Sequence, residues 1–159
     1  MTATARENIN LSLLDEPDVI NRLGFLSPRR RKALADAIGA RVDIAKDRME
    51  RIVSKLSGGN QQKVLFGKGF GEGRDIYIFD EPTTGVDMGT RAALYRLIKE
   101  IAEAGKAVVV VSSDLPEVMN LSHRLLVFSK GKVCAEFSGS EIVEGNILEH
   151  FFADTEAQA

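Results

Sequence analysis

Two adjacent carboxylates, Asp80 and Glu81, follow the short apolar run 76–79, and Pro82 comes directly after them. The run predicts a buried strand and the proline predicts a turn, so the acids lie at the carboxyl end of a strand. Ligands collect at that end of open α/β sheets. Two acids at such a position either hold a metal or handle a proton, because burying them unpaired is costly. For nucleotide chemistry, Asp80 would orient Mg²⁺ or its bound water and Glu81 would polarise an attacking water. The alternative is a pair of acids that simply faces solvent.

A second polar stretch opens a predicted helix with Ser57, Gly58, Gly59 and Asn60. Ser57 is well placed as an N-cap, and the two glycines leave the first backbone N–H groups open. A helix N-terminus with such donors binds phosphate readily. The alternative is a glycine-rich helix cap that has no ligand.

The pattern of elements predicts an α/β layered sheet behind a polar helical segment. We expect the first part of the chain, to about Lys55, to be helical, with a helix start at Ser27–Pro28. Leu34, Ala37, Ile38 and Arg41 form its apolar stripe with a charged edge. Buried strands are expected at 75–79 and 107–111, separated by a helix from about 88 to 104 whose apolar face is formed by Leu94, Leu97, Ile98 and Ile101. A helix at 116–121 and a hairpin of 124–128 with 132–137 are expected next. A closing helix capped by Ser140 should run to about 151, before a frayed tail.

Composition excludes several classes. The 159 residues carry a formal net charge of -2 and no long basic block, which argues against a nucleic-acid partner. The single cysteine, Cys134, rules out an intrachain disulfide, and its apolar neighbours predict a buried side chain. We expect no signal peptide, and the apolar run 107–111 is far too short to span a bilayer.

Together the motifs resemble a known family. The string LSGGNQQKV (56–64), followed by IYIFDEPTTGVD (76–87), is similar to the signature motif, Walker B strand and D-loop of ABC-type ATPases. With SSDLPEV (112–118) downstream and ENINLS (7–12) near the start, the chain most resembles the second ATPase domain of bacterial monosaccharide importers of the ribose, galactose and xylose type. The resemblance covers nearly the whole chain.

The resemblance implies a fold and its division. It implies a P-loop-NTPase-like α/β fold with a parallel sheet and a helical subdomain. The helical subdomain would be residues 1–55, the signature, Walker B and D-loop portion would be 56–153, and a tail would be 154–159.

The resemblance also implies residue roles. The signature residues, Ser57, Gly58, Gly59 and Asn60, would address the γ-phosphate of ATP held mainly by the opposite ATPase domain. Asp80 would contact Mg²⁺ through water and Glu81 would polarise the attacking water. Asp87 matches the D-loop aspartate that couples the two sites, and it is also an ordinary helix N-cap in sequence. Ser113 occupies the position at which this family usually carries a γ-phosphate-sensing histidine, a departure that puts full activity in doubt.

The partners implied are a second ATPase domain in a dimer sandwich, a membrane permease contacted through Ile9 to about Val53, and indirectly a periplasmic sugar-binding protein. No nucleic acid is expected. The implied location is cytoplasmic, peripheral on the inner face of the plasma membrane.

One part of the family's machinery is not found in the sequence. The phosphate-cradling string G-x-x-x-x-G-K-[ST] does not occur in the 159 residues. The family's P-loop strand would lie between the strands 107–111 and 125–129. We therefore expect a partial domain that turns over no ATP in isolation. The alternative is a non-catalytic adaptor or regulator derived from such an ATPase. A DNA-repair or chromosome-organising ATPase is disfavoured, because those carry long coiled coils before the signature and no heptad run occurs here.

Overall fold

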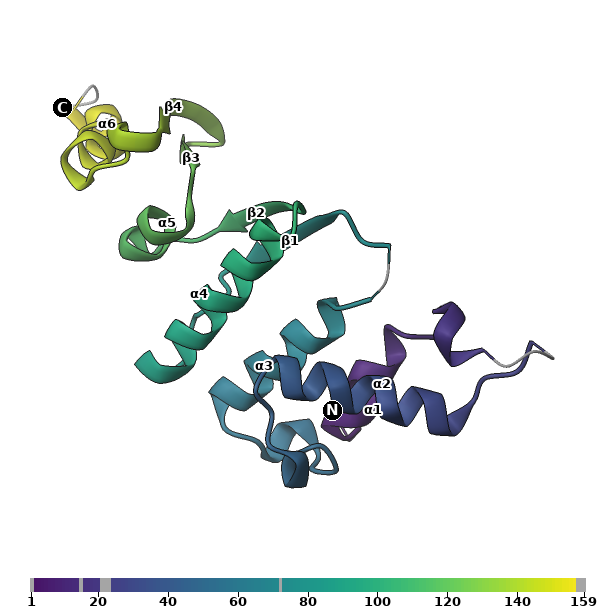
Figure 1. Ribbon diagram of the computed structural model, residues 1–159. Helices are drawn as coiled ribbons and strands as arrows, with labels where there is room; N and C mark the ends of the chain where they lie inside the picture. Colours follow the sequence, from purple (N-terminus) through teal and green to yellow (C-terminus); the bar gives the residue numbers. More distant parts are fainter. Residues whose placement is uncertain (1, 15, 21–23, 72, 157–159) are drawn as a thin grey trace. The chain divides into compact units, whose positions relative to one another are not determined.

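The computed structural model describes residues 2–14, 16–20, 24–71 and 73–156. Contacts divide the chain into two compact units, and Figure 1 labels the main helices and strands. The first unit comprises Met1–Ile78 and Pro82–Val109, and the second comprises Phe79–Glu81 and Val110–Ala159. The strands β1 and β2 each contribute residues to both units. The sequence-based division at residue 55 concerns the family's subdomains, and it stays a prediction.

The first unit is mainly helical. Its helices are α1 (Ala5–Leu11), η1 (Pro17–Val19), α2 (Pro28–Arg41), η2 (Lys46–Arg48), η3 (Val53–Lys55), α3 (Gly58–Gly69) and α4 (Met88–Glu103). The predicted start of α2 is confirmed, since the Ser27 side chain accepts from the Arg30 N–H and Pro28 is the first helical residue. The apolar face predicted for α4 is also confirmed: Leu94, Leu97, Ile98 and Ile101 are buried.

Helices α1, α2 and α3 share one core. Ile9 on α1 is 0% exposed, and a Cβ added to Gly67 on α3 would lie 3.0 Å from its Cδ1 atom. Glycine at position 67 therefore allows the two helices to approach closely. On α2 the predicted stripe is partly wrong, because Ala35, Ile38 and Gly39 are the buried residues and Ala37 is exposed. Tertiary packing shifted the buried face of α2 by about one residue.

The strands β1 (Ile76–Asp80) and β2 (Ala107–Val111) form a two-stranded sheet. The Ala107 N–H donates to the Asp75 carbonyl at one end of the pair, and the Glu81 N–H donates to the Val111 carbonyl at the other. The residue numbers of the paired positions increase in the same direction along both strands, so the pair is parallel. Helix α4 is the crossover that connects the two strands. This confirms the predicted parallel sheet.

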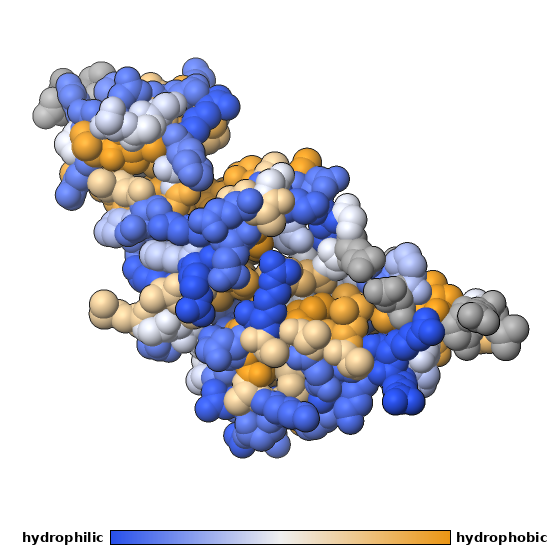
Figure 2. All heavy atoms as spheres, in the orientation of Figure 1, coloured by the Kyte–Doolittle hydropathy of each residue, from blue (hydrophilic) through white to orange (hydrophobic). Residues whose placement is uncertain are grey.

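The prediction that both strands are buried on both faces is wrong. Exposed and half-buried residues alternate along each strand. Ile76 is 67% exposed and Ile78 is 71% exposed on β1, and about half of the surface of Val109 and Val111 is exposed on β2, at 48% and 51%. Apolar surface is visible over this strand pair (Figure 2). Among the described residues, neither strand pairs with a third strand, and one face of the sheet stays uncovered.

The second unit has its own small core. Its further elements are α5 (Leu115–Leu121), β3 (Arg124–Ser129), β4 (Lys132–Ser138), η4 (Gly139–Glu141) and α6 (Glu144–Glu156). The core consists of Leu125, Val127 and Ile147, with side chains of α5 and β4 packed against it. The predicted hairpin is confirmed: β3 and β4 are antiparallel, and Lys130 and Gly131 both have the positive φ of a tight hairpin turn.

Three smaller predictions for the second unit are wrong: the cap of the closing helix, the end of that helix, and the burial of Cys134. Ser140 does not cap the closing helix, because the chain first forms η4, which Ser138 and Glu141 cap reciprocally. Helix α6 then begins at Glu144 and runs to Glu156, beyond the predicted end near 151; residues 157–159 lie outside the described part. Cys134 is exposed, since the hairpin register skips this residue and leaves it in a bulge. Within the described residues, no helix has the length and apolar character to span a bilayer.

Candidate nucleotide site

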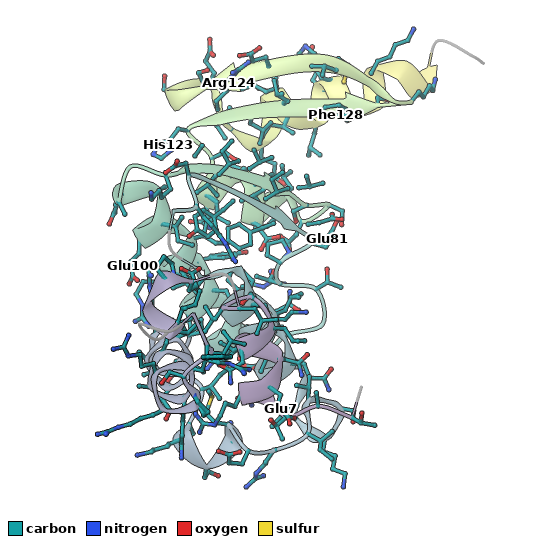
Figure 3. The ribbon with its side chains drawn as sticks, turned by 90° about the vertical axis from the view of Figure 1, so that its right-hand side faces the viewer. Glu7, Glu81, Glu100, His123, Arg124 and Phe128 are labelled. Carbon is teal, nitrogen blue, oxygen red and sulfur yellow. The ribbon has the colours of Figure 1, made fainter. Side chains whose placement is uncertain are left out.

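The predicted carboxylate pair lies at the end of β1 (Figure 3). Asp80 is the last residue of the strand and is exposed. Glu81 follows with a φ of 46°, in the left-handed region that a residue with a Cβ seldom adopts. Its backbone N–H donates to the Val111 carbonyl at 2.8 Å. The sheet therefore holds Glu81 in a strained conformation, of the kind that recurs at functional sites.

Ser113 lies against Glu81. The backbone N–H of Ser113 donates to Glu81 Oε1 at 2.8 Å, across a sequence separation of 32. The following residues fix this loop, because the Asp114 N–H donates to Ser112 Oγ at 3.0 Å and Asp114 caps α5. The structure thus brings together two of the predicted site residues. Ser113 contributes its main chain to this contact, and a different side chain at 113 would keep it.

The first turn of α3 departs from one prediction. Ser57 is the N-cap residue by position, but its side chain makes no capping hydrogen bond. Its Oγ instead accepts a hydrogen bond of 2.7 Å from Asn60 Nδ2. The Asn60 amide thereby replaces the backbone donor that would otherwise engage the serine. The two polar signature residues, Ser57 and Asn60, are in direct contact with each other.

The two glycines of the signature have a packing role. A Cβ added to Gly59 would lie 2.7 Å from Thr90 Oγ1 and 3.2 Å from Asp87 Oδ2, and one added to Gly58 would lie 3.2 Å from the Gly85 carbonyl oxygen. The first turn of α4 and the loop before it therefore press against the signature. Close packing explains Gly59 without a ligand, and it does not conflict with a phosphate-facing role for the same backbone.

Asp87 caps the N-terminus of α4, which confirms the N-cap predicted for it. Its Oδ1 accepts from the Thr90 N–H at 3.0 Å, and its Oδ2 accepts from Thr90 Oγ1 at 2.8 Å. The hydrogen bond from the Thr90 backbone, and then the one from its side chain, lower the pKa of Asp87 below its ordinary value. The coupling of two nucleotide sites through Asp87 stays a prediction.

Sequence reasoning missed the polar residues that hold α3 in place. Gln62 Nε2 donates to the Pro82 carbonyl at 2.6 Å, and Lys63 Nζ lies 2.7 Å from Asp43 Oδ2 and lowers the pKa of that carboxyl through a hydrogen bond. Arg48 Nη1 donates to Asn60 Oδ1 at 3.1 Å. Polar side chains at inward positions of a short helix were the available signal for Gln62; nothing in the sequence pattern indicated Arg48.

The described residues allow only a sparse metal site. They contain no group of three His, Cys, Asp or Glu side chains placed to hold a metal ion. Mg²⁺ commonly keeps several waters and takes one or two carboxylates together with substrate phosphates. The single exposed carboxylate of Asp80 fits that mode, and it does not fit an all-protein cage. Ser57, Gly58, Gly59, Asn60 and Asp87 belong to the first unit, whereas Asp80, Glu81 and Ser113 belong to the second.

Comparison with known proteins places these features in a family. A family model described as ABC transporter matches residues 2–84, more than half of the chain. The chain is 41% identical to the ribose import ATP-binding protein RbsA 3 of Rhizobium meliloti (strain 1021) over 88% of its length and 28% of that protein. It is 40% identical to the arabinose import ATP-binding protein AraG of Rhizobium johnstonii over 84% of the chain and 27% of that protein. It thus spans about a quarter of the length of the curated relatives it matches.

Solved structures agree on the fold. A dimeric, post-hydrolysis structure of the ATP-binding cassette MJ0796, bound to ADP and Pi, is 26% identical with a TM-score of 0.74, covering 86% of this chain and 56% of that one. The structure of MJ1267, an ATP-binding cassette of an ABC transporter, has a TM-score of 0.73 at 20% identity, covering 94% of this chain and 62% of that one. At 20% identity, the similarity to MJ1267 supports the fold alone.

Proposed function

This chain belongs to the ABC transporter family, and from that premise we propose that it supplies the signature loop, Walker B carboxylates and D-loop of an ATPase domain that energises bacterial monosaccharide import. The curated relatives named for ribose and arabinose import support the sugar assignment. The proposed cofactors are ATP and Mg²⁺. The 159 residues contain no phosphate-cradling string, so in this proposal a P-loop-bearing segment would complete the site.

The observation that carries the proposal is the hydrogen bond from the Ser113 N–H to the Glu81 carboxylate. A general base must be held at a defined position, with one carboxylate oxygen available to the water whose proton it accepts. The main-chain donor holds the Glu81 carboxylate at a defined position through its Oε1 atom. Mg²⁺, when bound, would neutralise charge on the phosphates, with Asp80 as its carboxylate contact through water.

The signature loop would act on a different nucleotide. Ser57, Gly59 and Asn60 would meet the γ-phosphate of an ATP held by a second ATPase domain, and Asp87 would link the two sites. The helical residues Ile9 to about Val53 would contact a membrane permease. The protein would then work on the inner face of the plasma membrane, with sugar delivered by a periplasmic binding protein.

Reconstituted ATP turnover tests this proposal. The chain is co-expressed with a P-loop-bearing segment of the RbsA 3 relative, and phosphate release is measured with MgATP and a second ATPase domain. We expect turnover from the combination and none from the chain alone. Glu81→Gln should lower turnover by about 10²- to 10⁴-fold, the usual contribution of a general base.

Two further variants serve as controls. Glu100 is on α4, where it pairs with Arg96, so Glu100→Gln makes the same chemical change away from the strand end and should leave turnover unchanged. Ser113→Ala keeps the main-chain donor and should also preserve turnover. Full turnover in Glu81→Gln, or an equal loss in Glu100→Gln, would contradict the role given to Glu81.

A non-catalytic adaptor is the second candidate. The observation that favours it is that residue 113 offers only a serine and its N–H where the resemblance leads one to expect an imidazole. An adaptor would bind its partner whether or not nucleotide is present. The nucleotide dependence of association therefore separates the two candidates.

A further inference from the structure

A short chain of polar groups joins η2 to the first turn of α3. Arg48 Nη1 donates to Asn60 Oδ1 at 3.1 Å, and Asn60 Nδ2 donates to Ser57 Oγ at 2.7 Å. All three residues belong to the first unit. Arg48 is 12 residues away from Asn60 in sequence, so the contact depends on the fold of the loop before the signature.

The guanidinium determines which way the Asn60 amide faces. Arginine has donors only, so the group that faces Arg48 must be the amide oxygen. The amide nitrogen then faces Ser57 and donates to it. With the opposite orientation, the amide oxygen would face Ser57 and accept its hydroxyl hydrogen.

The orientation of Asn60 in turn sets the role of the serine. Because Ser57 Oγ accepts from Asn60, its own hydrogen is directed elsewhere. Other N-cap side chains behave differently: those of Ser27 and Asp87 accept from the N–H three residues on, whereas Ser57 makes no such bond. The serine hydroxyl is thus held as a donor next to the N-terminus of α3, which favours an anion.

We infer that Arg48 is a positioning residue of the signature loop. Acting through Asn60, it keeps the Ser57 hydroxyl oriented as a hydrogen-bond donor to a phosphate oxygen. The inference rests on the proposed phosphate-facing role of this loop. The inference assigns this positioning role to Arg48 and not to Arg51, which lies in the same exposed segment and pairs with Asp47.

Nuclear magnetic resonance of the ¹⁵N-labelled chain tests the orientation directly. In the wild type, the two Asn60 side-chain amide protons should be well separated and slow to exchange, because one of them is hydrogen-bonded. Arg48→Gln should move the pair toward the position of a free amide. Arg48→Lys, which keeps a charged donor, should restore the wild-type signal. Arg51→Gln removes the same charge and should change nothing at Asn60.

A titration with inorganic triphosphate adds a functional readout. The backbone signals of Gly59 and Asn60 report binding, and Arg48→Gln should weaken it by about three- to tenfold, the factor expected for one hydrogen bond. Arg48→Lys should recover most of that affinity, and Arg51→Gln should retain it.

The possible failures are distinguishable. An Asn60 amide signal that is unchanged in Arg48→Gln would overturn the inference, as would an equal loss of triphosphate affinity in Arg51→Gln, which would reveal a general charge effect. If the wild type binds no triphosphate, the phosphate role of the loop in the proposed function fails. The inferred role of Arg48 toward phosphate falls with it, while the amide signal still decides whether Arg48 orients Asn60.

Discussion

The helical core and the strand pair differ in how far their apolar side chains are exposed to solvent. On α1, Ile9 is 0% exposed and packs against Gly67 of α3. On β1, Ile76 and Ile78 are 67% and 71% exposed. Both sets of residues belong to the first unit, so the difference does not separate one unit from the other. Each of these helices buries one apolar face against the others, whereas each strand exposes a row of its apolar residues.

The difference in exposure indicates how much each region gains from the burial of its apolar side chains. Helices α1, α2 and α3 bury Ile9, Ile38 and Val64 among themselves, and this burial should stabilise the region. A two-stranded sheet with one apolar face uncovered gains little from burial on that face and offers a surface for another chain. This is the arrangement expected if a further segment completes the sheet, although the position of a P-loop strand stays a prediction.

The largest expected effect is in the helical core. Ile9→Ala removes a fully buried side chain and should lower the free energy of unfolding by about 2–5 kcal/mol. Leu11→Ala on the same helix removes a side chain that is 60% exposed and should change it by about 0.5 kcal/mol or less. Urea denaturation of both variants makes the comparison. Similar losses in the two would show that α1 does not have a single buried face.

A much smaller effect on stability is expected on the strand face. Ile78→Thr keeps a β-branched residue at an exposed position, so the free energy of unfolding should change by about 0.5 kcal/mol or less. Binding of a hydrophobic dye and self-association should both decrease. A loss of several kcal/mol in urea denaturation would mean that Ile78 is buried in solution, and the contrast between the two regions would disappear.

The smallest effect concerns the cap that packs on the signature. Hydrogen bonds from Thr90 lower the pKa of Asp87 from its ordinary value of 3.8. The folded chain therefore binds this proton less tightly than the unfolded chain. The stabilising contribution is fully present above the ordinary pKa, and it is lost as pH falls through the lowered value.

Thr90→Ala removes the side-chain hydrogen bond and keeps the backbone one, so the pKa of Asp87 should rise only part of the way back. Titration of the Asp87 carboxyl by nuclear magnetic resonance measures this. A pKa that does not change in Thr90→Ala, or that falls, would show that the Thr90 hydroxyl does not stabilise the charged carboxylate.

Local patterns predicted what depends on neighbours in sequence. The apolar face of α4 follows from helical spacing, and the hairpin of β3 with β4 follows from two short apolar runs joined by a turn; both are confirmed. The burial of β1 was predicted wrongly, because a continuous apolar run shows only that a strand can be buried, and other chain segments decide whether it is.

The candidate site shows the same limit. The motifs indicated Asp80, Glu81 and the signature residues, but not the contacts among them. The bond from Ser113 to Glu81 requires the parallel pairing of β1 with β2, and the bond from Arg48 to Asn60 requires the fold of the preceding loop. Ser57 does not cap α3 because of a competing side chain, which a position-by-position rule does not consider.

The most direct test is sedimentation of the chain mixed with the intact RbsA 3 relative, with MgATP, with MgADP and without nucleotide. If the signature of this chain meets the γ-phosphate of an ATP held by a second domain, a complex should form with MgATP and dissociate in the other two conditions. A complex of equal strength in all three conditions, or no complex in any, would contradict that account.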